Sequence, residues 1–402
     1  MTRLPQSSTE DAGNDTWPVI VVGAGPAGAI CALTLARAGH KVLLLDKAAF
    51  PRDKVCGDLL IPDAVDLLQS IDLLENVKER AVAHRAVRIF SPGRTDFVVP
   101  GRFYGLRRLE FDHILAQAAV SAGAVLVQGK VVHIRNGELT CDVNVDGSDH
   151  SLHAEVVVLA TGASVNLADK LGLIERRSPS AVAIRAYFES DCPLDEIILA
   201  YERSLLPGYA WVYRVGEQRY NIGCGIITRD GALRTDNLQT CADLFIKEFP
   251  IAREVVARGT QVSQFRGAPL RCGLTGYHSL VHKNVLCIGE VIGTTFPFTG
   301  EGIGKAMHSG RIAGEVIDHA LREHKISVLQ EYASRIDREQ RPLYYGYAIA
   351  EKWLAHPWLS DLLAGRVRRS RYLQQQVTSF VDETGDPRRL FSLASLIKSL
   401  WK

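Results

Sequence analysis

Short apolar runs alternate with a helical pattern at the start of the chain. The run 18–22 is rich in β-branched residues and stops at Gly23, which is typical of a strand buried on both faces. Positions 27–38 carry small and apolar residues at helical spacing up to Gly39, a candidate C-cap, and 41–46 form a second apolar run. Strand, helix and strand within about 30 residues predict one βαβ unit with parallel strands and a right-handed crossover.

Later apolar runs predict a second group of strands followed by a helical end. The segments 124–128, 130–135 and 139–145 predict antiparallel β-structure, with a turn at Asn136-Gly137. A helix is expected from about Gly302 to Ala320, and a helical period dominates after position 326. Further strands are expected at 155–160, 181–188, 209–214, 220–226 and 284–288. The chain shows no internal repeat.

Composition excludes several classes of protein. The chain has 402 residues, 47% hydrophobic and 23% charged, typical of a globular protein of about two to three domains. With 47 Lys and Arg against 45 Asp and Glu, the net charge of +2 gives no reason to expect a nucleic-acid partner. No apolar run reaches the roughly 18 residues of a transmembrane helix, and the polar N-terminus lacks a signal-peptide core. The eight scattered cysteines form no CxxC pair, so we expect reduced thiols, no metal site and a cytoplasmic location.

A glycine motif lies between the first predicted strand and helix. Gly23, Gly25 and Gly28 form G-x-G-x-x-G around Pro26 and Ala27. The first glycine permits a tight turn, the second lets the backbone approach a diphosphate, and the third lets helix and strand pack closely. Asp46 ends the next predicted strand and can accept a hydrogen bond from a ribose hydroxyl. The motif in this context predicts a dinucleotide cradle.

A second glycine-rich loop, residues 289–303, follows the last predicted strand and leads into a helix. It predicts a second helix N-terminus aimed at the ligand, where backbone N–H groups stabilise negative charge on a reduced isoalloxazine ring. The alternative is that Gly300-Glu301-Gly302 only caps a helix. A nicotinamide dinucleotide site needs little beyond the βαβ unit. The segment Ala160-Thr161-Gly162, after another buried strand, is a further part of the chain that suits cofactor binding.

These motifs resemble, in order over about 19–320, those of FAD-dependent oxidoreductases of the geranylgeranyl reductase family. That family is related to aromatic hydroxylases such as p-hydroxybenzoate hydroxylase and to flavin-dependent halogenases. Segment 50–58 resembles its K-x-C-G motif, 207–213 its Y-x-W-x-F motif, and 289–303 its flavin loop. The resemblance implies that FAD is bound by Gly23, Gly25, Pro26, Ala27, Gly28, Asp46, Lys47, Arg108, Ala160, Thr161, Gly162, Gly289, Glu290, Pro297, Gly300, Glu301, Gly302 and Ile303.

The chain departs from the family pattern at three positions. Glu290 stands where the family usually has aspartate, and a contact to the ribityl chain remains plausible because a carboxylate is retained. Tyr213 and Arg214 replace the family's phenylalanine and proline, and a cation at the pocket rim would not suit a purely isoprenoid ligand. The halogenase signature W-x-W-x-I-P is absent, which disfavours halogenation.

Few side chains are needed for chemistry that the flavin performs. Cys56, which the family places near the flavin, is the candidate proton donor for reduction of a C=C bond, with a buried structural cysteine as the alternative. Tyr209 and Trp211 fall on one face of a strand and are expected to shape the substrate pocket, unless they are ordinary core aromatics. The other cysteines are expected in the core.

The resulting prediction is an α/β protein in which a Rossmann-like FAD-binding domain carries a β-sheet substrate domain and a helical C-terminal region. Residues 1–17 are expected to form a flexible tail and 326–402 the helical region. The FAD-binding domain is assigned to 18–84, 101–165 and 270–325, and the substrate domain to 85–100 and 166–269.

The leading functional hypothesis is reduction of a C=C bond in a bulky, mainly apolar isoprenoid or quinone-like substrate. Electrons would come from NAD(P)H or a reduced carrier protein. One alternative is a flavin monooxygenase that hydroxylates an aromatic or peptidyl substrate through a C4a-hydroperoxyflavin, and another is an FAD-containing binding or maturation protein without turnover. Aromatic, aliphatic and arginine residues between 344 and 371, with the end of the chain at 390–402, suit either peripheral membrane contact or a packed helical cap.

Overall fold

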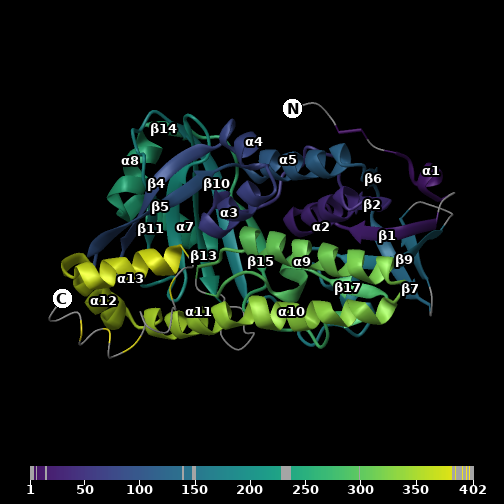
Figure 1. The fold of residues 1–402 in the computed structure, drawn as a ribbon. Helices are drawn as coiled ribbons and strands as arrows, with labels where there is room; N and C mark the ends of the chain where they lie inside the picture. The colour runs from purple at the N-terminus through teal and green to yellow at the C-terminus, as the bar shows by residue number, and fades with distance from the viewer. Residues whose placement is uncertain are drawn as a thin grey trace.

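The computed structural model describes residues 4–5, 7–13, 16–137, 140–146, 151–227, 237–297 and 299–382, with the single positions 385, 392, 395 and 398. The C-terminal stretch 390–402 considered above therefore lies almost entirely outside the described residues. Two β-sheets form the body of the protein, and the C-terminal helices run from beside the first sheet to the second (Figure 1).

The first sheet is built on the predicted βαβ unit. β1 (Thr16–Val22) pairs in parallel with β2 (Val42–Asp46), and α2 (Pro26–Arg37) connects them. On its other side β1 pairs in parallel with β9 (Ser151–Leu159). The sheet has the order β16-β17-β9-β1-β2-β6, with β8 on β9 and β7 on β8, and its other strands are β6 (Val125–Gln128), β7 (Val131–Asn136), β8 (Cys141–Val145), β16 (Val281–His282) and β17 (Val285–Cys287).

One pairing prediction for this sheet is wrong. The segment 124–128 was expected in antiparallel structure, but β6 pairs in parallel with β2. The reason is that α5 (Arg108–Ser121) covers the sheet before β6, and a crossover helix returns the chain in its original direction. The other two segments do form an antiparallel pair, β7 with β8, and Gly137 N donates to Thr140 O at 3.0 Å in the connecting turn.

Small residues let α2 pack closely against α9 (Ile303–Arg322). A Cβ atom on Gly310 would lie 2.1 Å from the Ala27 carbonyl oxygen, and one on Gly314 would lie 2.7 Å from the Thr34 Cβ. Such distances leave no space for a side chain. The contact places the N-terminal ends of both helices at one edge of the sheet.

The second sheet has the order β14-β10-β13-β12-β11-β4-β5-β3, and β15 pairs with β10. It is antiparallel except where β11 runs parallel to β4. Because it includes residues 59–60, 82–90 and 96–105, it extends beyond the segment 85–100 assigned to the substrate domain. Its strands are β3 (Leu59–Leu60), β4 (Val82–Phe90), β5 (Asp96–Gly105), β10 (Ala181–Ser190), β11 (Ile197–Ala200), β12 (Tyr209–Arg214), β13 (Arg219–Ile227), β14 (Gly259–Gln261) and β15 (Arg266–Leu270).

The remaining elements are helical, and the predicted fold class and helical C-terminal region are confirmed. The chain also contains the short helices α1 (Thr9–Gly13), α3 (Pro62–Ser70), α4 (Leu74–Lys78) and α6 (Asn166–Lys170) and the 3₁₀ turn η1 (Gly289–Ile292). α7 (Leu238–Glu248) and α8 (Pro250–Ala257) cover the second sheet. The C-terminal region consists of η2 (Ile326–Gln330), α10 (Glu331–Glu339), α11 (Arg341–Leu354), α12 (Pro357–Arg369) and α13 (Arg371–Val381).

In its described residues, the segment 1–17, which was expected as a flexible tail, contacts the first sheet, where Ser7 N donates to Leu126 O at 3.0 Å. Leu4, Ala12 and Trp17 are buried, and the Trp17 indole donates to the Ala12 carbonyl at 2.9 Å. These three side chains belong to the hydrophobic core that includes the first sheet. In the part of the chain that the structure describes, no helix has the length and apolar character that crossing a membrane requires.

Candidate active site

A cavity of about 880 Å³ lies between the two sheets. Its walls come from the β1–α2 loop, the segment 52–59, the start of α5, the strands of the second sheet and the loop before α9. Of the residues predicted for the site, those that line it are Gly23, Gly25, Pro26, Ala27, Asp46, Lys47, Cys56, Arg108, Ala160, Thr161, Gly162, Tyr209, Trp211, Glu290, Gly300, Glu301, Gly302 and Ile303. Gly28, Gly289 and Pro297 do not line it.

The glycine loop forms one end of the cavity. Gly23 has a φ of +108°, and a Cβ there would lie 2.3 Å from the Ala160 carbonyl oxygen. Gly28 packs even more closely, since its Cβ would lie 1.8 Å from the Gly23 oxygen. The Asp46 carboxylate accepts from Ala24 N at 3.0 Å and so holds the loop onto β2. The loop delivers the N-terminus of α2 to the cavity, which suits a diphosphate.

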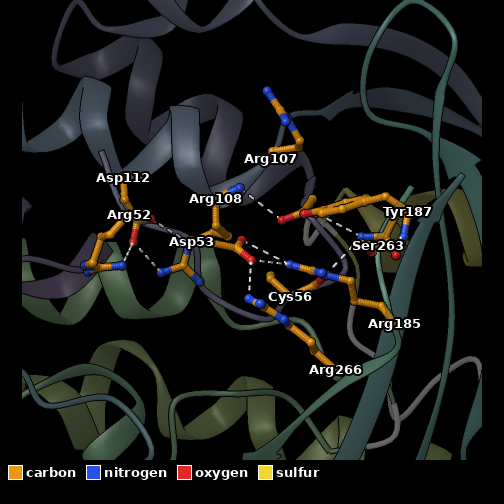
Figure 2. Close-up of polar contacts among 12 residues, drawn as sticks. Arg52, Asp53, Cys56, Arg107, Arg108, Asp112, Arg185, Tyr187, Ser263 and Arg266 are labelled. Atoms are coloured by element: carbon orange, nitrogen blue, oxygen red, sulfur yellow. Dashed lines mark hydrogen bonds and ion pairs between the residues drawn. The ribbon is translucent and has the colours of Figure 1, made fainter. Parts of the chain in front are cut away.

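Two arginines lie beside this helix N-terminus. Arg108 Nε and Nη2 donate to both carboxylate oxygens of Asp112, at 2.5 and 2.8 Å. Arg52 donates to Asp112 at 2.9 Å and to Asp46 at 3.1 Å, as Figure 2 shows for the contact with Asp112. Burial raises the pKa of Asp112, but Arg108 and Arg52 outweigh it and hold the pKa below its usual value. A Cβ on Gly25 would lie 3.9 Å from both guanidinium groups, so they face the same end of the cavity.

Glu290 and the start of α9 form another part of the wall. In the described structure, Glu290 Oε1 is buried and has no hydrogen-bond partner, while Oε2 lies 3.8 Å from Lys54 Nζ. A buried carboxylate oxygen without a donor fits a hydroxyl-bearing ligand. Gly302 precedes α9, whose N-terminal N–H groups face the cavity edge. With the glycine loop, these groups fit FAD: a cradle for its diphosphate, an acceptor for ribityl hydroxyls and a helix dipole for its ring.

Cys56 lies in the wall on a segment held by the second sheet. The Asn221 side-chain amide donates to the carbonyl oxygens of Cys56 and Gly57, at 3.0 and 2.9 Å. The Tyr213 hydroxyl also donates to the Gly57 oxygen, at 2.7 Å. Burial raises the pKa of the Cys56 thiol, although the Arg108 guanidinium acts against the rise. Cys56 is therefore a thiol, able to give a proton, at neutral pH.

Tyr209 and Trp211 lie side by side on the cavity face of β12, with ring centroids 5.9 Å apart. The Trp211 indole donates to Asn221 at 2.8 Å, which links it to the Cys56 segment, and the Tyr209 hydroxyl donates to the Thr299 carbonyl. Arg214 does not belong to the rim as expected from the sequence, because it lines neither described cavity and pairs with Asp195. Because Arg214 pairs with Asp195 outside both cavities, its charge does not disfavour an apolar ligand in the cavity.

Sequence reasoning assigned no role to Arg52, Lys54, Asp58 or Asn221. Arg52, Lys54 and Asp58 lie in the segment 50–58 together with Cys56, and this closeness in sequence could have indicated that they line the same site. Asn221 gave none, because only strand pairing brings it against that segment. Among the described residues, no group of three or more His, Cys, Asp and Glu side chains is placed to hold a metal ion.

Comparison with known protein families matches residues 16–241, more than half of the chain, to the family described as FAD binding domain. The chain belongs to this family. The expected FAD cofactor is thereby confirmed, and the reductases among the relatives below confirm the expected FAD-dependent oxidoreductase.

Three relatives are similar in sequence over most of this chain. Conditioned medium factor receptor 1 of Dictyostelium discoideum is 28% identical over 81% of this chain and 67% of that protein. Menaquinone reductase of Mycolicibacterium smegmatis is 32% identical over 76% of this chain and 77% of that protein. Digeranylgeranylglycerophospholipid reductase 1 of Methanopyrus kandleri is 30% identical over 82% of this chain and 88% of that protein. The stated resemblance to geranylgeranyl-type reductases is confirmed.

Solved structures share the fold over nearly the whole chain. A geranylgeranyl bacteriochlorophyll reductase-like protein from Thermoplasma acidophilum has a TM-score of 0.77 and 20% identity, covering 96% of both chains. A flavin-dependent brominase has a TM-score of 0.77 and 18% identity, covering 96% of this chain and 98% of that one. At such identities the likeness concerns the fold alone.

Proposed function

We propose that this FAD-binding protein reduces a carbon–carbon double bond in a bulky, mainly apolar substrate, an isoprenoid chain or a quinone side chain. The menaquinone and digeranylgeranylglycerophospholipid reductases among its relatives support the reaction class. The shape and lining of the cavity support the substrate class.

The wall formed by the second sheet is mainly apolar, and its charged residue Arg185 pairs with Asp53. Its side chains come from β10 to β13 and β15, and Trp211 and Tyr209 add two aromatic faces. A hydrocarbon chain gains free energy when it leaves water for such a surface. The lining residues on this side include Ala181, Val182, Ala183, Ile184, Leu199, Ile226, Ile227, Ala268 and Leu270.

The observation that carries the proposal is a second, apolar chamber of about 110 Å³ beside the cavity. Leu199, Thr299 and Glu301 line both spaces, so the chamber lies directly behind the active-site wall. Its other walls come from the second sheet and from α11, α12 and α13, and include Val87, Ile89, Phe97, Phe103, Leu354, Leu363, Ala364, Val367, Val377 and Phe380. An apolar end of the substrate would extend into this space while its reacting bond stays in the cavity.

In this proposal Cys56 donates the proton that completes reduction. Bound FAD supplies hydride transfer when it is reduced. Cys56 holds its proton at neutral pH, and Trp211 and Tyr209 orient the apolar chain beside it. Electrons would come from NAD(P)H or a reduced carrier protein, and bleaching of the flavin absorbance by one of them would identify the donor.

We further propose that α12 contacts an anionic membrane surface from which the substrate enters. Trp358 and Leu362 are 66% and 43% exposed and lie one turn apart, and Arg366 and Arg369 follow on the same side. The opposite face of α12 lines the apolar chamber. Exposed apolar side chains next to arginines suit anionic lipid. Vesicles containing phosphatidylglycerol should sediment the protein, and a Trp358→Ser, Leu362→Ser variant should lose this binding, whereas Val262→Ser should not.

The reaction is tested with FAD-loaded protein reduced anaerobically and mixed with isoprenoid alcohols or menaquinones. Reoxidation of the flavin with formation of a product that carries two more hydrogens in its isoprenoid chain supports the proposal, whereas a quinol with an unchanged chain does not. A product containing oxygen, formed only when air is admitted, would replace it with the monooxygenase hypothesis. Failure of any such compound to reoxidise the flavin would leave the binding-protein hypothesis.

A further inference from the structure

A buried carboxylate, Asp58, lies in the cavity wall two residues from Cys56. Its side chain is fully buried, and its backbone has a φ of +65°, a conformation that non-glycine residues adopt rarely. Oδ1 accepts from Arg108 N at 3.0 Å, and Oδ2 accepts from the Tyr187 hydroxyl at 2.6 Å and from Asn221 at 2.9 Å. All three donors are neutral groups.

The nearby guanidinium groups are engaged by other carboxylates. Arg185 Nη2 lies 3.0 Å from Asp53, which Arg266 also approaches, and Figure 2 shows both arginines converging on Asp53. Arg108 is held by Asp112. Among the described residues, no cation lies within ion-pair distance of Asp58. Burial raises the pKa of Asp58 to about 6, although its hydrogen bonds and Arg185 oppose the rise.

Asp58 and Cys56 form one connected unit. Asn221 binds the Cys56 carbonyl and the Asp58 carboxylate with the same amide group. The backbone N–H of Asp58 stabilises the thiolate of Cys56, and the carboxylate charge of Asp58 destabilises it. Both residues belong to the wall of the same cavity. The proton of one group therefore depends on the charge of the other.

We propose that Asp58 resupplies the proton that Cys56 gives to the substrate. The inference rests on the proposed reduction. One carbon of the substrate double bond receives hydride. The Cys56 S–H bond breaks as a new C–H bond forms at the other carbon of that double bond. The thiolate then takes the proton from the Asp58 carboxyl group, and the carboxylate regains a proton from bulk solvent, so that one solvent proton is consumed for each substrate molecule reduced. No net electron transfer occurs in the last two steps, and the segment 56–58 returns to its starting state.

The test must separate Asp58 from the other charged and titratable groups that face it. These are Arg108 with Asp112 on α5, Arg185 and Tyr187 on β10, Tyr213 on β12 and Cys56 on its own segment. Two substitutions isolate Asp58. Asp58→Asn removes the charge, and Tyr187→Phe removes one hydrogen bond to the carboxylate and should move its titration to higher pH.

The first measurement is the rate of Cys56 alkylation by iodoacetamide in resting FAD-loaded protein at different pH values, with Cys56→Ala as the blank. In the wild type the logarithm of the rate should flatten near pH 6, where Asp58 ionises and opposes the thiolate. Asp58→Asn should remove the flattening and speed alkylation at pH 7.5 by about 10-fold, the effect of one pKa unit. Tyr187→Phe should move the flattening upward, and Asp66→Asn, an exposed carboxylate, should change nothing.

The second measurement is the pH dependence of kcat. The wild type should turn over faster at pH 6 than at pH 8, and Asp58→Asn should lose this dependence while it keeps the flavin spectrum. An alkylation profile of Asp58→Asn that matches the wild type, or an unchanged kcat profile, overturns the inference. If the alkylation effects appear but no C=C substrate is reduced by the wild type, the proposed function fails and the coupling of Asp58 to Cys56 stands.

Discussion

Arg52 Nη1 lies 2.9 Å from the Asp112 carboxylate, which links the segment after β2 to α5 at the glycine-loop end of the cavity. Asp112 also neutralises Arg108, and its side chain is fully buried. One carboxylate therefore holds two cations in place beside the N-terminus of α2. Without it, Arg108 would lack a buried counter-charge and Arg52 would keep only Asp46.

We therefore expect Asp112→Asn to be destabilising by about 3–5 kcal/mol, the usual cost of leaving a buried charge unpaired. FAD retention should fall at least about 10-fold, because the arginines that face the diphosphate end lose their orientation. Chemical denaturation and flavin release on gel filtration measure both effects. Asp66→Asn breaks the exposed pair with Arg102 and should cost under about 1 kcal/mol. Similar losses in the two variants would contradict this account.

The contact between α2 and α9 predicts a second result. Gly310→Ala places a methyl group 2.1 Å from the Ala27 carbonyl, so the helices must separate. Overpacking of this kind costs roughly 1–3 kcal/mol, and FAD binding should weaken as the two helix N-termini move apart. Gly365→Ala in α12 meets no atom within 4 Å and should be neutral or slightly stabilising. Equal melting temperatures for the two variants would show that the helix contact tolerates a side chain.

Cys56→Ala tests the proton donor. Loss of a general acid lowers rates by about 10²–10⁴-fold, so kcat should fall within this range while flavin content and spectrum stay unchanged. Cys241→Ala, a partly buried thiol on α7, serves as the matched control and should keep full activity. Full activity of Cys56→Ala with a normal spectrum would remove Cys56 from the mechanism.

The apolar chamber predicts selectivity for tail length. Ala364→Phe adds a ring to the chamber wall on α12, so substrates with long tails should show a raised KM, while short prenyl substrates should be reduced normally. Ala348→Phe places the same ring on the exposed face of α11 and should affect neither class. Equal effects of Ala364→Phe on long and short substrates would mean that the tail does not occupy the chamber.

Local patterns were sufficient for the βαβ unit and the glycine loop, because their geometry depends on neighbours within one short segment. Gly23 needs a positive φ, and the apolar runs on either side of α2 can only be buried strands. The resemblance extended this to the flavin loop and to Cys56. Both ends of the cavity were therefore recognised before the fold was known.

Tertiary structure alone decided the pairing of β6, the place of Arg214 and the environment of Asp58. β6 is parallel because α5 crosses the sheet before it, and Arg214 turns to Asp195 at the end of β12. Asp58 meets Tyr187 and Asn221 across more than 120 residues of chain. Charge and hydrogen bonding depend on distance in space, which a linear pattern does not contain, whereas backbone geometry and periodic burial depend on neighbours along the chain.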